Sequence, residues 1–240
     1  MSKFLLLQIR DSDDPIREQE IGCFSRALGC EDDDIATSNL LFTVPTQSQV
    51  ESARAVFIGG SGNYSVVERG EWLPPALQSL RQLCSAGKPV FASCWGFQAI
   101  ALALGGKVVT DLDRAELGSL TLKTTPAAAG DPLFASLAPS FVGQLGHQDI
   151  VDELPADAIC LASSDKVENE AFRLRDKPIY ATQFHPELNR QTLIDRVKKY
   201  PQYVEKIART NCDEFVAACR EAPKTDELLR RFVELFVSPS

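Results

Sequence analysis

The chain has 240 residues, of which 44% are hydrophobic, so it can bury a full core and lies at the upper end of what one α/β domain occupies. Its formal net charge of -8 argues against a nucleic-acid or anionic-lipid partner, because no basic stripe is present to neutralise phosphates. A small-molecule substrate is therefore favoured.

The N-terminal apolar run, residues 4–9, is too short for the hydrophobic region of a signal peptide, and no small-residue cleavage site follows it. No later apolar stretch is long enough to cross a membrane. We therefore expect a soluble, cytoplasmic protein with neither a nucleic-acid nor a membrane partner.

The seven cysteines are odd in number, include no CxxC pair and fall within expected helices and strands. This pattern is typical of reduced thiols in a cytosol.

Because the chain has only two histidines, a zinc site of ordinary ligand spacing is hard to build. The acidic runs at 11–14 and 31–34 are typical of solvated loops. We predict neither a metal nor another cofactor.

The first hundred residues alternate short apolar runs with helical patterns, which is typical of a sheet with helices on both faces. Glycine and proline mark the ends of several of these segments. The predicted elements, in chain order, are a strand at 4–9, a helix at 16–28, strands at 39–44 and 55–58, a helix at 71–86, a strand at 90–93 and a helix at 95–104.

The segment from 107 to 187 supplies short strands without intervening helices, so the sheet should be mixed. These strands are predicted at 107–109, 119–124, 158–162, 171–174 and 179–184. Beyond Asn189 the pattern becomes helical, at about 190–210, 212–220 and 225–236, with Pro223 as a break.

The predicted fold class is therefore α/β: a Rossmann-like or flavodoxin-like, largely parallel mixed sheet with helices on both faces. We expect a main domain over 1–188 and a C-terminal helical extension, 189–240, packed on it. The extension should lie beside the catalytic face or form a subunit contact, because its apolar side chains need covering. Those side chains are Leu193, Ile194, Val197, Ile207, Phe215, Leu228, Phe232 and Phe236.

Cys94 stands where the strand at 90–93 meets the following helix. Small residues flank it in Ala92-Ser93-Cys94-Trp95-Gly96, the spacing that a sharp elbow needs to expose a nucleophile without side-chain collisions. The first turn of a helix also favours the thiolate. The alternative is an unreactive, buried cysteine at a strand end.

A base and a carboxylate follow a later apolar run, in His185-Pro186-Glu187. Proline favours extended dihedrals in the residue before it, and residues i and i+2 of an extended segment project to the same side. One imidazole nitrogen can then face the Cys94 sulfur while Glu187 holds the other, as in a nucleophile, base and orienting-acid triad. The alternative is a strand-end histidine capped by an exposed glutamate.

An acyl-transfer site also needs preorganised donors for a tetrahedral oxyanion. The turn Gly59-Gly60-Ser61, at the end of the strand at 55–58, could bring a backbone N–H close to the sulfur. The N–H of Trp95, directly after the nucleophile, would be the second donor.

Six blocks in order resemble the class I (triad) glutamine amidotransferase family, most closely the glutaminase domain of GMP synthase and its free-standing relatives. The similarity covers most of residues 4–188. The blocks are Cys94-Trp95-Gly96-Phe97-Gln98, Gly105-Gly106, Ala115-Glu116-Leu117-Gly118, Gly146-His147-Gln148-Asp149, Ala162-Ser163-Ser164-Asp165 and the run from Ile179 to Glu187. Ala92-Ser93 departs from the usual Gly-x before the nucleophile, and Phe97 replaces a residue that is often histidine, small or polar.

This resemblance implies that 1–188 is a catalytic domain that hydrolyses glutamine through a γ-glutamyl thioester and releases ammonia, with a separate synthetase chain as the acceptor. The implied ligand is glutamine or a γ-glutamyl small molecule; the resemblance does not fix the oligomeric state. The implied site residues are Cys94 as nucleophile, His185 as base, Glu187 as orienting carboxylate, Gly60 and Trp95 as oxyanion donors, and Gln98, Gly59, Ser61 and His147 as substrate contacts.

Three alternatives to a glutaminase remain open. A γ-glutamyl peptidase would use the same triad, and an assay with glutamine beside γ-glutamyl dipeptides would separate the two. A homoserine acyltransferase, which has a related triad fold, would consume acyl-CoA. A non-catalytic binding protein on the same fold would turn over none of these compounds.

Overall fold

Nine strands form one mixed sheet in the computed structural model, which describes residues 3–68 and 70–237. The parallel half consists, from edge to centre, of β2 (Ile35–Asn39), β1 (Phe4–Gln8), β3 (Ala55–Ile58), β4 (Val90–Ser93) and β11 (Ile179–Thr182). The antiparallel half continues with β10 (Ala171–Leu174), β9 (Ala158–Ser163), β6 (Glu116–Thr124) and β7 (Ser140–His147). A separate pair joins β5 (Lys107–Thr110) to β8 (Asp149–Glu153). The predicted mixed, largely parallel α/β class is confirmed.

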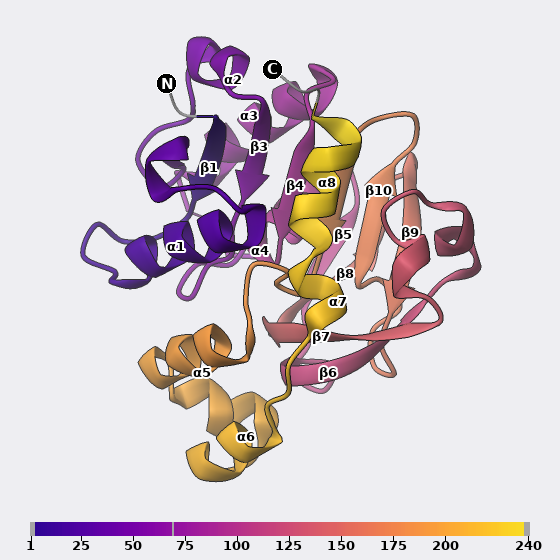
Figure 1. Ribbon diagram of the computed structural model, residues 1–240. Coiled ribbons are helices and arrows are strands. Elements are labelled where there is room, and N and C mark those ends of the chain that lie inside the picture. Colours follow the sequence, from indigo (N-terminus) through magenta and orange to yellow (C-terminus); the bar gives the residue numbers. More distant parts are fainter. Residues whose placement is uncertain (1–2, 69, 238–240) are drawn as a thin grey trace.

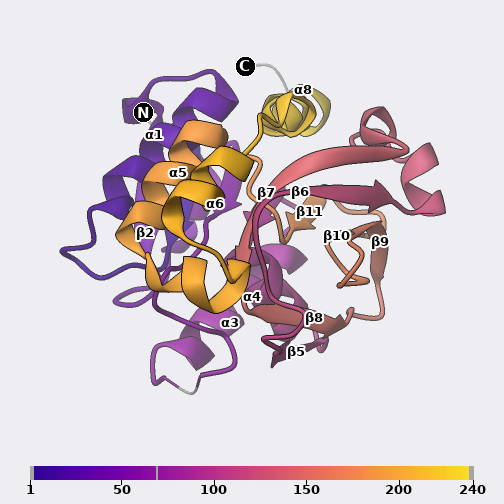
Figure 2. The same ribbon diagram turned by 90° about the horizontal axis from the view of Figure 1, so that it is seen from below.

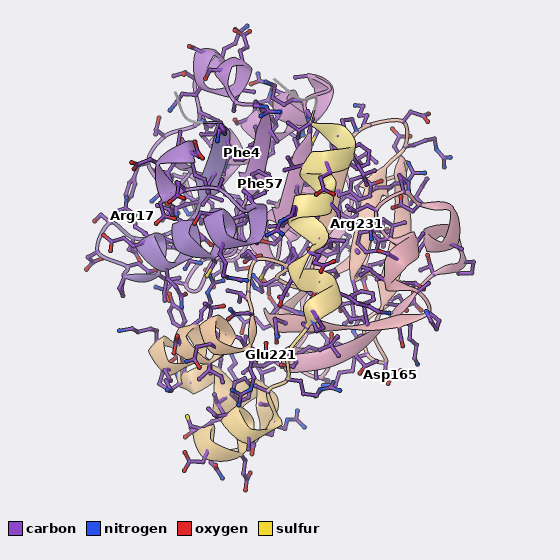
Figure 3. All side chains as sticks on the ribbon, in the orientation of Figure 1. Phe4, Arg17, Phe57, Asp165, Glu221 and Arg231 are labelled. Atoms are coloured by element: carbon purple, nitrogen blue, oxygen red, sulfur yellow. The ribbon has the colours of Figure 1, made fainter. Side chains whose placement is uncertain are left out.

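Helices cover both faces of the parallel half (Figure 1). Alternate residues of β1 point to opposite faces, as in any strand: Leu5 and Leu7 join the core under α3 (Leu73–Ser85) and α4 (Trp95–Ala103). Phe4 and Leu6 join the core under α1 (Ile16–Leu28) and α8 (Leu228–Phe236). On this second face the rings of Phe4 and Phe57 lie 5.6 Å apart, edge to face, on neighbouring strands (Figure 3).

The C-terminal segment packs on the sheet at two places. Its first part is α5 (Arg190–Lys199), a π-helical turn (Val204–Ala208) and α6 (Cys212–Ala218). Figure 2 shows α5 and α6 in front, beside α1 and the β6–β7 pair. The rest is a short α7 (Pro223–Asp226) and α8, whose Phe232 is fully buried against Phe57, Phe91 and Tyr180. The last helix thus belongs to the same core as the sheet.

Several predicted bounds were wrong. The strand expected at 39–44 lies at 35–39, because the Asn39 side chain accepts a hydrogen bond from the N–H of Leu41 and turns the chain. Phe42, expected in that strand, is 67% exposed. The helix expected at 190–210 ends at Lys199, just before the Tyr200-Pro201 step that disfavours helical dihedrals.

Other elements were not anticipated. Pro223 starts α7 instead of breaking a helix, a position where its missing N–H costs nothing. The strand at 179 stops at Thr182, and the helix expected at 225–236 is divided between α7 and α8. Not predicted from the sequence were β7, β8, the short α2 (Gln47–Ser52) and the 3-10 turns at Asp32–Asp34, Pro126–Gly130 and Ala135–Leu137. Among the described residues, none of the helices has the length and apolarity to cross a membrane.

Candidate active site

Cys94 forms a strained elbow between β4 and α4. Its φ of 51° and ψ of -104° lie outside the regions that residues with a side chain normally adopt. The next-but-one residue must be glycine, since a Cβ at Gly96 would lie 2.8 Å from Ile58. The Cys94 sulfur donates to the carbonyl oxygen of Gly146 at 3.7 Å. A sulfur raised on such a turn at a helix N-terminus has the position of a nucleophile.

His185 leaves the same edge of the sheet as Cys94, because β4 and β11 are parallel neighbours with Ser93 opposite Thr182. The backbone N–H of His185 donates to the carbonyl of Gln144 at 2.8 Å and fixes the turn. Its side-chain Nδ1 lies 2.6 Å from Oε1 of Glu187. The structure therefore brings the three residues of the predicted triad to one place.

Opposing electrostatic effects act on the His185 imidazole. Burial disfavours the charged ring, but the Glu187 carboxylate and the hydrogen-bonded Cys94 outweigh it and raise the pKa of His185 to about 9. Burial likewise opposes the charge of Glu187, which is fully buried; His185 and then Arg196 prevail and lower the pKa of that carboxyl. Glu187 and the Cys94 sulfur thus favour the protonated imidazole, so a proton that leaves the thiol is held on His185.

Two backbone amides adjoin the Cys94 elbow. The Gly59 carbonyl accepts from the N–H of Gly96, so in a trans peptide the N–H of Gly60 points the opposite way. A Cβ on Gly60 would lie 2.8 Å from Cε1 of His185 and 3.5 Å from Cβ of Cys94. Trp95 is the first residue of α4, so its N–H has no acceptor within the helix. The predicted oxyanion donors thus flank the elbow.

A cavity of about 920 Å³, including its open mouth, lies over Cys94. This size suits a small molecule. Besides Cys94, Trp95 and His185, its walls include the predicted substrate contacts Ser61, Gln98 and His147.

The predicted substrate contacts differ in their surroundings. The Gln98 amide nitrogen donates to the carbonyl of Asp149 and to Oε1 of Gln183, so its side chain is fixed. The Ser61 hydroxyl accepts from the N–H of Tyr64. Gly59 is absent from the cavity wall: a Cβ there would lie 2.5 Å from the buried carboxylate of Glu20. Gly59 therefore serves packing behind the site.

The outer wall of the cavity comes from the C-terminal segment, which was expected beside the catalytic face or in a subunit contact, but Arg196, Tyr200 and Tyr203 were not predicted as site residues. Tyr203 donates from its hydroxyl to the carbonyl of Gly62 at 2.6 Å, and Tyr200 donates to Asp14 at 3.1 Å. Arg196 on α5 places Nη1 3.7 Å from Oε1 of Glu187. No short motif marks these residues, because their role depends on how α5 packs against the first third of the chain.

One group of side chains among those described has the geometry to hold a metal ion: Glu116, His147 and Glu170. All three are buried, and His147 also lines the cavity. The prediction that no metal binds depended on the histidine count, and it stays a prediction; one histidine and two carboxylates are a ligand set that zinc accepts.

The chain matches a known family and several curated proteins. The family described as glutamine amidotransferase class-I matches residues 36–196. A GMP synthase (glutamine-hydrolyzing) of Caldicellulosiruptor saccharolyticus is 40% identical over 108 residues, which is 45% of this chain and 20% of that protein. The GMP synthase (glutamine-hydrolyzing) of Vibrio atlanticus is 39% identical over 103 residues, which is 43% of this chain and 19% of that protein. The match thus spans about a fifth of these relatives.

Solved structures share the fold over nearly the whole chain. A glutamine amidotransferase from Thermotoga maritima is 20% identical, with a TM-score of 0.78 and coverage of 99% of both chains. A glutamine amido transferase from Methylobacillus flagellatus is 17% identical, with a TM-score of 0.72, covering 100% of this chain and 98% of that one. A putative GMP synthase subunit a from Thermoplasma acidophilum is 21% identical, with a TM-score of 0.61, covering 84% and 97%.

Proposed function

Because the chain belongs to the class-I glutamine amidotransferase family, we propose that it hydrolyses the side-chain amide of glutamine through Cys94, His185 and Glu187. The observation that carries this proposal is the strained Cys94 elbow beside a buried His185–Glu187 pair with an Nδ1–Oε1 distance of 2.6 Å. A cysteine held at positive φ lowers the stability of the fold, and a cysteine with a purely structural role does not require that conformation.

In the first half of the reaction the Cys94 sulfur attacks the side-chain carbonyl carbon of glutamine, after its proton has passed to His185. The N–H groups of Gly60 and Trp95 stabilise the negative charge that develops on the carbonyl oxygen. Their position on either side of the elbow supports this assignment. The intermediate collapses by breaking its C–N bond. His185 gives its proton to the departing nitrogen, so ammonia leaves and a γ-glutamyl thioester remains.

In the second half a water molecule attacks the thioester, with His185 now taking the water proton. The same donors stabilise the second oxyanion, and breaking the C–S bond releases glutamate and restores the Cys94–His185 pair. Glu187 remains a carboxylate throughout and holds the imidazole in orientation. Its full burial and its contact with Arg196 support this assignment.

The proposed substrate class follows from the walls of the cavity. Tyr200, Tyr203 and Ile207 of the C-terminal segment form part of its wall, which favours a compact molecule such as glutamine over an extended γ-glutamyl peptide. Ser61, Gln98 and His147 are among the polar side chains of this wall. We assign the binding of the α-amino and α-carboxylate groups to Ser61 and Gln98, because the two ring nitrogens of His147 already face the carbonyl of Asp149 and the carboxylates of Glu116 and Glu170.

Ammonia released in this site would be consumed by a synthetase partner. The support is the match to GMP synthases that hydrolyse glutamine, together with the structural neighbour named as a GMP synthase subunit a. We further propose a cytoplasmic location, in keeping with seven cysteines that are all free.

The direct test is an assay of the full chain with glutamine and with γ-glutamyl dipeptides. We expect ammonia and glutamate from glutamine, and an intact-mass increase equal to one γ-glutamyl group when the reaction is quenched with acid. Faster turnover of the dipeptides would favour the γ-glutamyl peptidase. Absence of both turnover and adduct across the panel would refute the enzymatic proposal.

The pH dependence offers a second test, through Glu187→Gln. Because His185 must be protonated to expel ammonia and its pKa is raised to about 9, activity should fall as the pH rises through about 9. The amide cannot stabilise the imidazolium, so in Glu187→Gln this alkaline limb should move to lower pH and kcat/KM should drop by at least about 10²-fold. The measurement is kcat/KM against pH, with Glu205→Gln on the exposed side of the C-terminal segment as control. An unmoved limb would show that Glu187 does not act on His185.

A further inference from the structure

Three buried side chains from distant parts of the chain converge beside the catalytic cavity. Glu116 begins β6, His147 ends the neighbouring β7 directly opposite it, and Glu170 immediately precedes β10. Their exposed fractions are 5%, 5% and 0%. Among the described residues, Oε2 of Glu116, Nε2 of His147 and both carboxylate oxygens of Glu170 have no hydrogen-bond partner. Buried polar atoms without partners are costly, so this cluster calls for a physical explanation.

The distances between these atoms suit a shared ion. Nε2 of His147 lies 3.3 Å from Oε2 of Glu116 and 3.9 Å from Oε1 of Glu170. One donor atom from each residue can be chosen so that all lie within 4.8 Å of one another. Ligand atoms that bind one ion with bonds of roughly 2.0–2.2 Å are themselves about 3–4 Å apart. Small side-chain rotations would therefore complete a three-ligand site.

The hydrogen bond at Nδ1 of His147 determines whether Nε2 presents a hydrogen or a lone pair to the two carboxylates. Nδ1 lies 3.1 Å from the carbonyl oxygen of Asp149, and a carbonyl can only accept, so Nδ1 carries a hydrogen. In the neutral ring Nε2 then presents a lone pair toward two carboxylates. A backbone carbonyl on the outer nitrogen is the usual arrangement behind a metal-binding histidine. Two carboxylates buried beside a lone pair repel one another unless a proton or a metal ion lies among them. Burial and the Glu116 charge raise the pKa of Glu170, so in the metal-free protein a proton shared between the two carboxyl groups takes the place that a metal ion would occupy.

We propose that Glu116, His147 and Glu170 bind one divalent transition-metal ion of the zinc class. The imidazole nitrogen argues against magnesium and calcium, which take oxygen ligands, whereas one nitrogen and two carboxylates suit zinc. His147 lines the cavity, which gives the ion a route from solvent. The ion would tie β6, β7 and the segment before β10 together. This inference is independent of the proposed glutaminase activity, since binding requires neither Cys94 nor His185.

The test is titration of the reduced full chain with Zn²⁺, followed by calorimetry. Cys94→Ser serves as the starting protein, so that the thiol in the cavity does not compete. We expect one equivalent to bind and Tm to rise by about 5 °C with Zn²⁺ at about 100 times Kd. Glu170→Gln, nearly identical in shape, should weaken binding by at least about 100-fold, because even partners outside the ligand set are worth 10–100-fold. Glu168→Gln, an exposed acid two residues earlier, should bind like the starting protein.

Co²⁺ provides a second readout that does not depend on any further variant. Visible bands of nitrogen and oxygen ligation are expected in the same starting protein, without the charge-transfer band of a thiolate ligand. Binding that is equally tight in Glu170→Gln, a thiolate band with Co²⁺, or no saturable binding of one equivalent would each overturn the proposal. Circular dichroism of Glu170→Gln, with Glu116→Gln as a second ligand variant, guards against loss of folding as the cause.

Discussion

Cys94→Ser should lower glutamine turnover by at least about 10³-fold, because a serine hydroxyl is far harder to ionise than a thiol and its ester cannot reproduce the thioester. Serine differs from cysteine by one atom, so the elbow with φ 51° and the packing of Gly96 on Ile58 should survive. The measurement is ammonia release under saturating glutamine, with intact-mass detection of the γ-glutamyl adduct. Both signals should vanish together.

The control for that substitution is Cys212→Ser, because Cys212 is an exposed thiol on α6, outside the cavity wall. It should leave turnover within about two-fold of wild type, as exposed substitutions away from special features usually do. A Cys94→Ser protein with more than a tenth of wild-type activity and an unchanged melting curve would exclude Cys94 as the nucleophile.

His185→Gln should cause a loss of similar size, on the order of 10³-fold or more, because the same imidazole activates the sulfur and protonates the departing nitrogen. Groups that act as one unit have non-additive effects. The double variant Cys94→Ser/His185→Gln should therefore be scarcely slower than either single one. Multiplied effects in the double variant would show that the two residues act independently.

A direct measurement supports the kinetic one, since the chain contains only two histidines. In proton NMR the ring resonance that disappears in His185→Gln identifies His185, and its titration in wild type should give a pKa of about 9. Alkylation of Cys94 by iodoacetamide at neutral pH should also slow in the variant, because no imidazole takes the thiol proton. An ordinary titration near pH 6.5 would contradict the buried charge pair.

The proximity of Cys94, His185 and Glu187 could be predicted because it depends on local geometry. Small residues on both sides of Cys94 allow a sharp elbow, and Pro186 extends the backbone so that His185 and Glu187 project together. The parallel order of strands then brings both segments to one edge of the sheet. The predicted resemblance to the class I amidotransferase family is confirmed by the match over 36–196.

Elements that depend on distant contacts escaped prediction. β7 contains Gly143 and Gly146, which weaken the strand pattern, yet Gly143 is needed there since a Cβ would lie 3.0 Å from Leu122 and 3.1 Å from Phe184. The apolar residues Leu40 and Phe42 favoured a strand prediction, but the turn at Asn39 ends the strand before them. In both cases packing or side-chain hydrogen bonding outweighed intrinsic preference.

The amino-acid sequence by itself determined the alternating fold, the Cys94 elbow and the pairing of His185 with Glu187, because each rests on residues within one short segment. Only the tertiary structure decided that Tyr200 and Tyr203 wall the cavity, and that Glu170 joins Glu116 and His147. Those side chains come from segments that are far apart in the sequence. The free energy that brings the segments together belongs to the whole core, so no periodic pattern within one segment reveals these contacts.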